Sequence, residues 1–241
     1  MYNENIEFKG DMTMKNYIEE NKRINEELKK LYEDNTEKFL ELWKNCFEPE
    51  INKRIKEFEP LPKTINDFGI VDTKYYDTDN GILVIGKETR GWNYSLRNWL
   101  NTLAVKNVSI DKNDETKHPK MWYNIGRWAK LIHNPNQEIS NLAFEKKEAL
   151  SGLSYIAFTN INKLGGFERS GKSYQSLLKE SFVVDMIIKE IEIIKPKFIV
   201  LCGINKDYFG DVDKSIKIVK MPHPSAMKST EKMLQQLKEQ L

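Results

Sequence analysis

Four short apolar segments that alternate with helical segments constrain the fold of this chain more than any other feature. The first, Ile82 to Gly86, has four consecutive aliphatic residues, which is typical of a strand buried on both faces. Further strands are expected at Ser154 to Thr159, Phe198 to Cys202 and Ser215 to Lys220. Strands that alternate with helices form a mostly parallel sheet covered on both faces. We therefore predict an α/β protein, a three-layer α/β/α sandwich with a mostly parallel four-stranded central sheet.

Apolar residues at three- and four-residue steps predict the helices. They fall in Tyr94 to Ala104, Lys120 to His133, Tyr174 to Ile194 and Lys228 to Leu241. From Met14 to Phe58 a single apolar stripe indicates further helices, and Pro49 is expected to begin a new one. We divide the chain into a helical extension packed on the core, residues 1–66, and an α/β domain, residues 67–241. The extension could instead contact DNA or a protein partner.

Composition indicates the cellular compartment of the protein but not its binding partner. The formal net charge is +2, so binding to nucleic acid requires a local basic surface. The two cysteines, Cys46 and Cys202, are typical of a reduced compartment and are too few for a four-thiolate cluster. No apolar run approaches the length of a membrane span, and the first residues do not resemble a signal peptide. A cytoplasmic protein is expected, without a metal site at His118 or His133, since neither has spaced companions.

Polar side chains follow three of the predicted strands. Glu88 comes just after the first strand, Asn160 ends the second, and His223 follows the last. In open α/β sheets, ligands bind beyond the carboxyl ends of the strands, so these residues are expected to share a site. Each has a simpler interpretation, because Glu88 could lie in a solvated loop, Asn160 in a turn, and His223 in a loop stiffened by its two prolines.

These three segments together resemble the motifs of the uracil-DNA glycosylase superfamily. The first motif is Gly86-Lys87-Glu88-Thr89-Arg90, the middle residue is Asn160, and the late motif is His223-Pro224-Ser225-Ala226-Met227. The similarity extends from about Gly81 to Lys228 and leaves the helical first quarter unmatched. It implies a monofunctional DNA glycosylase, which flips a base out of single- or double-stranded DNA and leaves an abasic site.

The resemblance also implies a role for each matching residue. Glu88 would stabilise the cationic sugar and orient water, His223 would donate to the departing pyrimidine, and Asn160 would read the base edge beside Gly86. An aromatic residue would stack on the base, with Trp92 and Tyr94 as candidates. Met227 occupies the wedge position, although a single methionine is more often filler. The expected DNA contacts are Lys87, Arg90, Arg169, Lys172, Ser225, Met227 and Lys228. Neither a metal nor a cofactor is implied, and a monomer is expected.

Departures from the family motif bear on the substrate. The family member that excises only uracil uses an aromatic residue of the first motif to exclude a methyl group at C5, and here that position is Arg90, followed by Gly91. We therefore expect a damaged or modified pyrimidine, including one substituted at C5, unless Trp92 takes the place of the missing aromatic residue. The hypermodified bases of phage genomes are of this kind and would suit a role in phage defence.

Two alternatives remain. Gly166 to Ser173 reads G-F-E-R-S-G-K-S, which matches the phosphate-loop pattern and would make the chain a nucleotide-binding NTPase. The preceding strand is expected to end near Thr159, and no later strand ends in an aspartate for magnesium. The second alternative is a catalytically inactive member of the fold that binds DNA or a partner.

Overall fold

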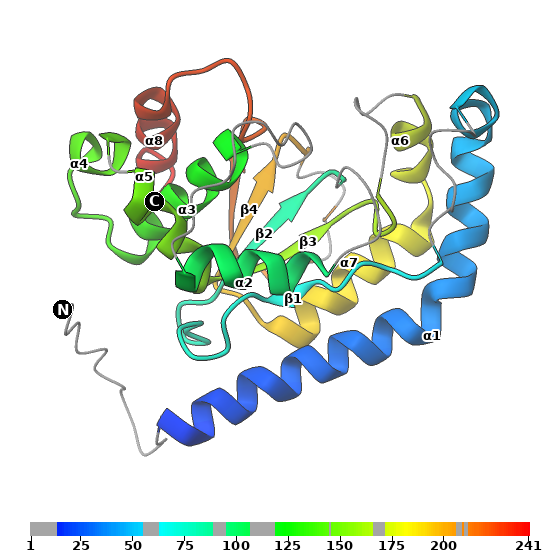
Figure 1. Ribbon diagram of the computed structural model, residues 1–241, viewed down its shortest axis with the longest axis horizontal. Helices are drawn as coiled ribbons and strands as arrows, with labels where there is room; N and C mark the ends of the chain where they lie inside the picture. Colours follow the sequence, from blue (N-terminus) through cyan, green and yellow to red (C-terminus); the bar gives the residue numbers. More distant parts are fainter. Residues whose placement is uncertain are drawn as a thin grey trace.

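A five-stranded sheet lies at the centre of the computed structural model (Figure 1). The structure describes residues 14–54, 63–88, 95–106, 119–144, 146–165, 172–205, 209 and 212–241. The strands are β1 (Gly69–Ile70), β2 (Ile82–Gly86), β3 (Ile156–Asn160), β4 (Phe198–Cys202) and β5 (Lys217–Met221), in the order β1-β3-β2-β4-β5. Strands β2 to β5 pair in parallel, and β1 pairs antiparallel with β3. The prediction of four strands is therefore wrong by one, because two-residue β1 is too short to give an alternating pattern.

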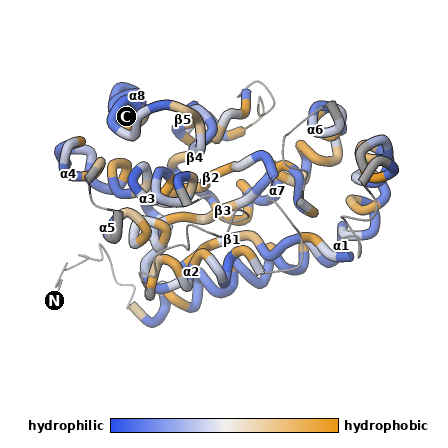
Figure 2. The backbone as a smooth tube through the Cα atoms, turned by 45° about the horizontal axis from the view of Figure 1, so that its top comes forward, coloured by the Kyte–Doolittle hydropathy of each residue, from blue (hydrophilic) through white to orange (hydrophobic). Residues whose placement is uncertain are grey.

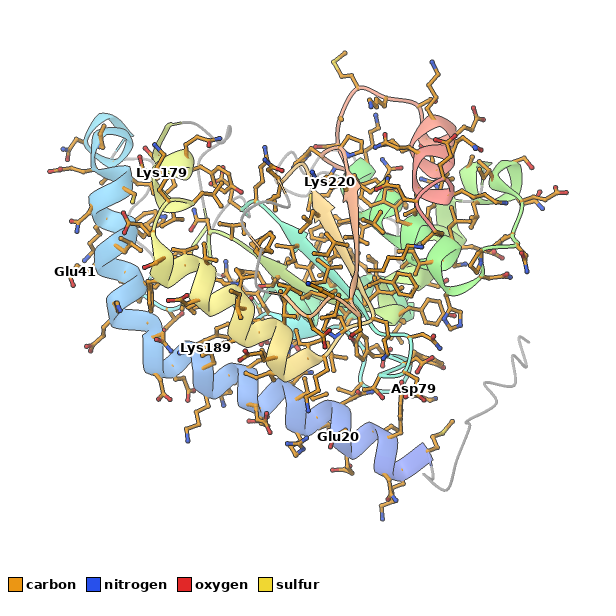
Figure 3. All side chains as sticks on the ribbon, turned by 180° about the vertical axis from the view of Figure 1, so that it is seen from behind. Glu20, Glu41, Asp79, Lys179, Lys189 and Lys220 are labelled. Atoms are coloured by element: carbon orange, nitrogen blue, oxygen red, sulfur yellow. The ribbon has the colours of Figure 1, made fainter. Side chains whose placement is uncertain are left out.

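Helices cover both faces of this sheet. Figure 1 shows α2 (Leu96–Lys106) and α3 (Pro119–His133) on one face, and Figure 3 shows α1 (Met14–Arg54) and α7 (Ser181–Ile194) on the other. Helix α8 (Thr230–Lys238) packs against α3 and β5. The remaining helical segments are α4 (Ile139–Phe144), α5 (Lys146–Ser151), a 3-10 turn (Gly152–Tyr155) and α6 (Lys172–Leu177). None of the helices in these ranges is long and apolar enough to cross a membrane.

The burial of the strands follows their sequence patterns. Every residue of β2 and β3 is buried, as expected for strands covered on both faces. Strand β5 lies at the sheet edge and alternates, with Lys217 and Lys220 exposed and Val219 and Met221 buried. Figure 2 shows the same contrast, with apolar colour along the central strands and mixed colours along the helices. Glu41 and Lys189 mark the outer sides of α1 and α7 in Figure 3, and both are exposed.

Helix α1 is one 41-residue helix that continues through Pro49. The prediction that a new helix begins at this proline is therefore wrong, although a proline inside a helix removes one backbone hydrogen bond. Asn35 and Thr36 donate side-chain hydrogen bonds to the carbonyl groups of Leu31 and Tyr32, four residues earlier. Such bonds often bend helices, and Figure 1 shows that α1 is bent.

A side chain of α1 also provides hydrogen-bond partners for the backbone of β1, the strand at the edge of the sheet. The amide of Asn25 accepts from the backbone N–H of Ile70 at 2.8 Å and donates to the carbonyl of the same residue at 3.1 Å. The apolar side of α1, which includes Leu28, Phe39 and Trp43, belongs to the same buried cluster as the strands. The first helix is therefore packed along the edge and one face of the sheet.

The helix expected from Tyr174 to Ile194 is two helices, so that prediction is also wrong. Glu180 adopts extended backbone angles between α6 and α7, which interrupts the helical hydrogen bonds. The apolar periodicity continues through the break, so the sequence pattern does not reveal it. Helix α7 ends where expected, at Lys195, which has a left-handed φ of 52° before Pro196.

Candidate functional site

Strands β2 and β3 bring the first two candidate segments together. Gly86, the last residue of β2, is the register partner of Asn160, the last residue of β3. The pairing continues past both strands, because the N–H groups of Ile161 and Asn162 donate to the carbonyls of Gly86 and Lys87. The segments that carry Glu88 and Asn160 are thus fixed side by side at the carboxyl edge of the sheet, as a parallel sheet requires.

The side chain of Asn160 is completely buried, and neither amide atom has a hydrogen-bond partner within the described part of the chain. A buried amide without partners costs free energy, so such a group usually has a ligand, a water or a functional role. The amide lies over Gly86, where a Cβ atom would overlap Oδ1 of Asn160 and lie 3.2 Å from Cζ of Phe158. Glycine at this position therefore makes room for the amide.

Glu88 is half-buried and contacts the loop that follows β3. Nδ2 of Asn162 lies 3.4 Å from Oε2 of Glu88 and donates a shorter bond, 2.7 Å, to the carbonyl of Gly165. A carboxylate held in this way could orient a water or stabilise a positive charge beside Asn160.

His223 lies two residues beyond β5, with its ring oriented by Ser225. The backbone N–H of Ser225 donates to Nδ1 at 3.3 Å, and Oγ of the same serine lies 2.7 Å from that nitrogen. A backbone N–H can only donate, so Nδ1 acts as an acceptor. In the neutral imidazole the proton then sits on Nε2, which can donate to a substrate.

Gly203 separates His223 from the other two residues. It follows β4, which lies between β2 and β5 in the sheet, so His223 follows a strand two spacings, or about 10 Å, from β2. Gly203 is exposed, has φ +70°, and a Cβ atom there would lie 3.3 Å from the backbone nitrogen of His223. Gly203 thus places no side chain at the end of the strand that lies between β2 and β5.

Helix α3 holds the loop that carries His223. Nδ2 of the buried Asn124 donates to the carbonyl of Pro224 at 2.6 Å, and Nζ of Lys120 donates to the carbonyl of Ala226 at 2.7 Å. Figure 1 shows this loop extending from β5 to α8 beyond the ends of the strands. Met227 within it is 103% exposed, so its side chain has no packing role in the core.

Of the other predicted site residues, some lie within the described ranges and others do not. Lys87 is half-buried with Nζ 5.8 Å from the ring centre of Tyr174, Ser225 is half-buried and Lys228 is exposed. Lys172 is the first residue of α6. Four predicted residues lie outside the described ranges: Arg90, Trp92, Tyr94 and Arg169. The structure thus places Glu88 and Asn160 on two segments that are hydrogen-bonded to each other. His223 lies beyond β5, on the other side of the strand that ends before Gly203.

Sequence reasoning did not find the residues that support this site. Asn162 lies two positions after Asn160, a spacing that continues the strand alternation and could have indicated it. Asn124 and Lys120 lie among the apolar residues of α3, where no pattern singles them out. Lys163 is completely buried, whereas lysine is almost always a surface residue.

The phosphate-loop alternative gains no support. Residues 166–171 lie outside the described ranges, β3 ends at Asn160, and α6 after the loop has six residues. The last residue of β4 is Cys202 and the next is Gly203, so no aspartate follows this strand directly. Within the described ranges no cluster of three histidine, cysteine, aspartate or glutamate residues could hold a metal.

Comparisons of the chain with models of protein families, with curated proteins and with solved structures find no match. The functional assignment therefore rests on the chemistry of the residues at the sheet edge.

Proposed function

We propose that this protein is a DNA glycosylase that hydrolyses the N-glycosidic bond of a flipped-out, damaged or modified pyrimidine. The observation that carries the proposal is the buried amide of Asn160, which has no hydrogen-bond partner in the described part of the chain. A pyrimidine edge offers a donor and an acceptor to such an amide. The binding of a base would therefore satisfy two polar atoms that otherwise cost free energy.

The neighbours of Asn160 suit the two charges that develop when the bond breaks. The sugar becomes positive, and the carboxylate of Glu88 would stabilise it and orient the attacking water. The base becomes negative, and the N–H group at Nε2 of His223 would donate a hydrogen bond to its oxygen. Ser225 accounts for the required tautomer, since its N–H donates to Nδ1. The hydroxide of the water bonds to C1′ of the sugar as the bond to the base breaks. Glu88 would accept the proton of the water, and that proton ends on the departing base, so His223 keeps its own.

The surface beside the site suits DNA. The exposed Met227 lies next to the exposed Lys228, on a loop attached to α3. An apolar side chain at this place could fill the gap that a flipped base leaves in the stack. A C5-substituted base is part of the proposal because the motif position at Arg90 lacks an aromatic side chain.

A panel of labelled oligonucleotides tests this function. Single- and double-stranded forms would carry uracil, mismatched thymine, 5-hydroxymethyluracil or glucosylated hydroxymethylcytosine, and alkali would then cleave any abasic site. We expect cleavage at one or more of these bases with the wild type and with Glu192→Gln, an exposed glutamate of α7. Glu88→Gln should lower the rate about 100- to 10,000-fold. Absence of cleavage at every base, with binding of ATP abolished by Lys172→Ala, would instead support the NTPase.

A further inference from the structure

A buried ion pair lies directly behind the candidate site. Nζ of Lys163 lies 2.6 Å and 2.7 Å from the two carboxylate oxygens of Glu190, and both side chains are completely buried. Lys163 belongs to the loop after β3, three residues past Asn160, whereas Glu190 lies on α7. The pair therefore links the site loop to the helix beneath the sheet.

Two further side chains complete this polar cluster. Oγ1 of Thr159 accepts from Nζ of Lys163 at 2.6 Å and lies 3.1 Å from Oε2 of Glu190. The hydroxyl of Tyr32, on α1, donates to Oε1 of Glu190 at 2.6 Å. Nζ of Lys163 also lies 5.2 Å from the ring centre of Phe68. Strand β3, its loop, α1 and α7 thus meet at one hydrogen-bonded cluster.

Stability alone is a poor explanation for such a pair. Removing two charges from water costs free energy for each ion, and apolar replacements of a buried pair are often neutral or stabilising. The cost is evident in Lys163, since burial lowers its pKa to about 8 even though Glu190 acts in the opposite direction. The contacts of Nζ of Lys163 with Glu190 and Thr159 instead restrict the positions that its loop can adopt.

The loop that Lys163 anchors carries the polar contacts of the site. Its first residues pair with β2 through the bonds from Ile161 to Gly86 and from Asn162 to Lys87, at 3.0 Å and 2.9 Å. The backbone carbonyl of Lys163 itself accepts from the N–H of Asn66 at 3.0 Å. Helix α1 contacts this loop directly, because Nε1 of Trp43 donates to the carbonyl of Gly165 at 3.2 Å.

We propose that Lys163, through Glu190 and Tyr32, is a positioning residue that holds the loop after β3 in register with β2, so that Asn160 and the Asn162–Glu88 contact keep the geometry needed for catalysis. The catalytic part of this inference rests on the proposed glycosylase function, whereas the anchoring of the loop does not. It gives α1 a part in the site, because Tyr32 and Trp43 both come from that helix.

Charge-removing variants separate positioning from stability. Lys163→Met and Glu190→Leu each leave one buried charge without its partner and should lower Tm strongly. The double variant removes both charges, so its Tm should return most of the way to the wild-type value. In the double variant we expect a single-turnover rate about 100-fold below the wild type, with binding of DNA changed much less. A Lys189→Met/Glu192→Leu variant, at exposed positions of α7, is the matched control.

Amide hydrogen exchange provides a readout that needs no activity. Exchange at Ile161 and Asn162 should be faster in the double variant, whereas exchange at Val84 and Val200 in the strands should stay at the wild-type rate. If the double variant does not fold, Tyr32→Phe, which removes one hydrogen bond to Glu190, should still speed exchange at Asn162. Wild-type exchange and turnover in a folded variant would overturn the inference. If the wild type releases no base but exchange changes as expected, the glycosylase function fails and the anchoring stands.

Discussion

Gly86 and Asn160 are register partners at the ends of two parallel strands, and the missing side chain of the first gives space to the amide of the second. Both residues are buried, and the amide of Asn160 has no partner among the residues that the structure describes. Under the proposed function, this pair would read the edge of a bound base.

Gly86→Ala should displace the amide of Asn160, because the added methyl would overlap Oδ1. We expect the rate of base release to fall about 100-fold, measured under single turnover. The double variant Gly86→Ala/Asn160→Ala is the control, because Asn160→Ala already removes the displaced group. If the two losses simply add, the glycine acts by some route other than the amide.

Ser225→Ala should weaken the orientation of His223 without removing it. The hydroxyl is lost from Nδ1, but the backbone N–H still donates to that nitrogen. We expect the ring to keep its proton on Nε2, as read from imidazole ¹⁵N chemical shifts, and the rate to fall about tenfold. His223→Ala should cost about 100-fold or more. A proton on Nδ1 in the wild type at neutral pH would contradict the assigned tautomer.

Met227→Ala should leave the free energy of unfolding unchanged within about 0.5 kcal/mol, because the side chain is exposed. Base release from duplex DNA should fall more than release from single strands, since only the duplex has a stack to fill. Val105→Ala, at an exposed apolar position of α2, serves as the control and should affect neither substrate. Equal losses on both substrates would argue against a wedge.

The stability of the protein should fall steeply above pH 10. Burial raises the pKa of Tyr32 well above 10, reinforced by the Glu190 carboxylate, and burial likewise raises the pKa of Tyr76. Above pH 10 the unfolded chain loses phenolic protons that the folded chain keeps, so each residue lowers the free energy of unfolding by about 1.4 kcal/mol per pH unit. Denaturation between pH 9.5 and 11.5 measures this slope. Tyr32→Phe and Tyr76→Phe should each reduce this slope by the contribution of one proton, about 1.4 kcal/mol per pH unit. An unchanged slope in either variant would contradict the raised pKa of that tyrosine.

The sequence predicts the sheet and the placement of its polar ends because both depend on local patterns. Apolar runs locate β2 to β5, and the residues just after them necessarily meet at one edge. The supporting groups depend instead on tertiary contacts. Nothing in the sequence indicates that Lys163 is buried against Glu190, 27 residues away, or that Asn124 meets Pro224, 100 residues away. The uninterrupted α1 was missed because packing outweighs the helix-breaking tendency of Pro49.

Mass spectrometry of the products tests the central claim most directly. Oligonucleotides that carry each modified pyrimidine would be incubated with the wild type, Glu88→Gln, Asn160→Ala and Glu192→Gln. The account predicts release of an intact free pyrimidine and a matching abasic strand from the wild type and Glu192→Gln, with little or none from the other two variants. DNA of unchanged mass in every reaction, or equal release by Glu88→Gln, would contradict it.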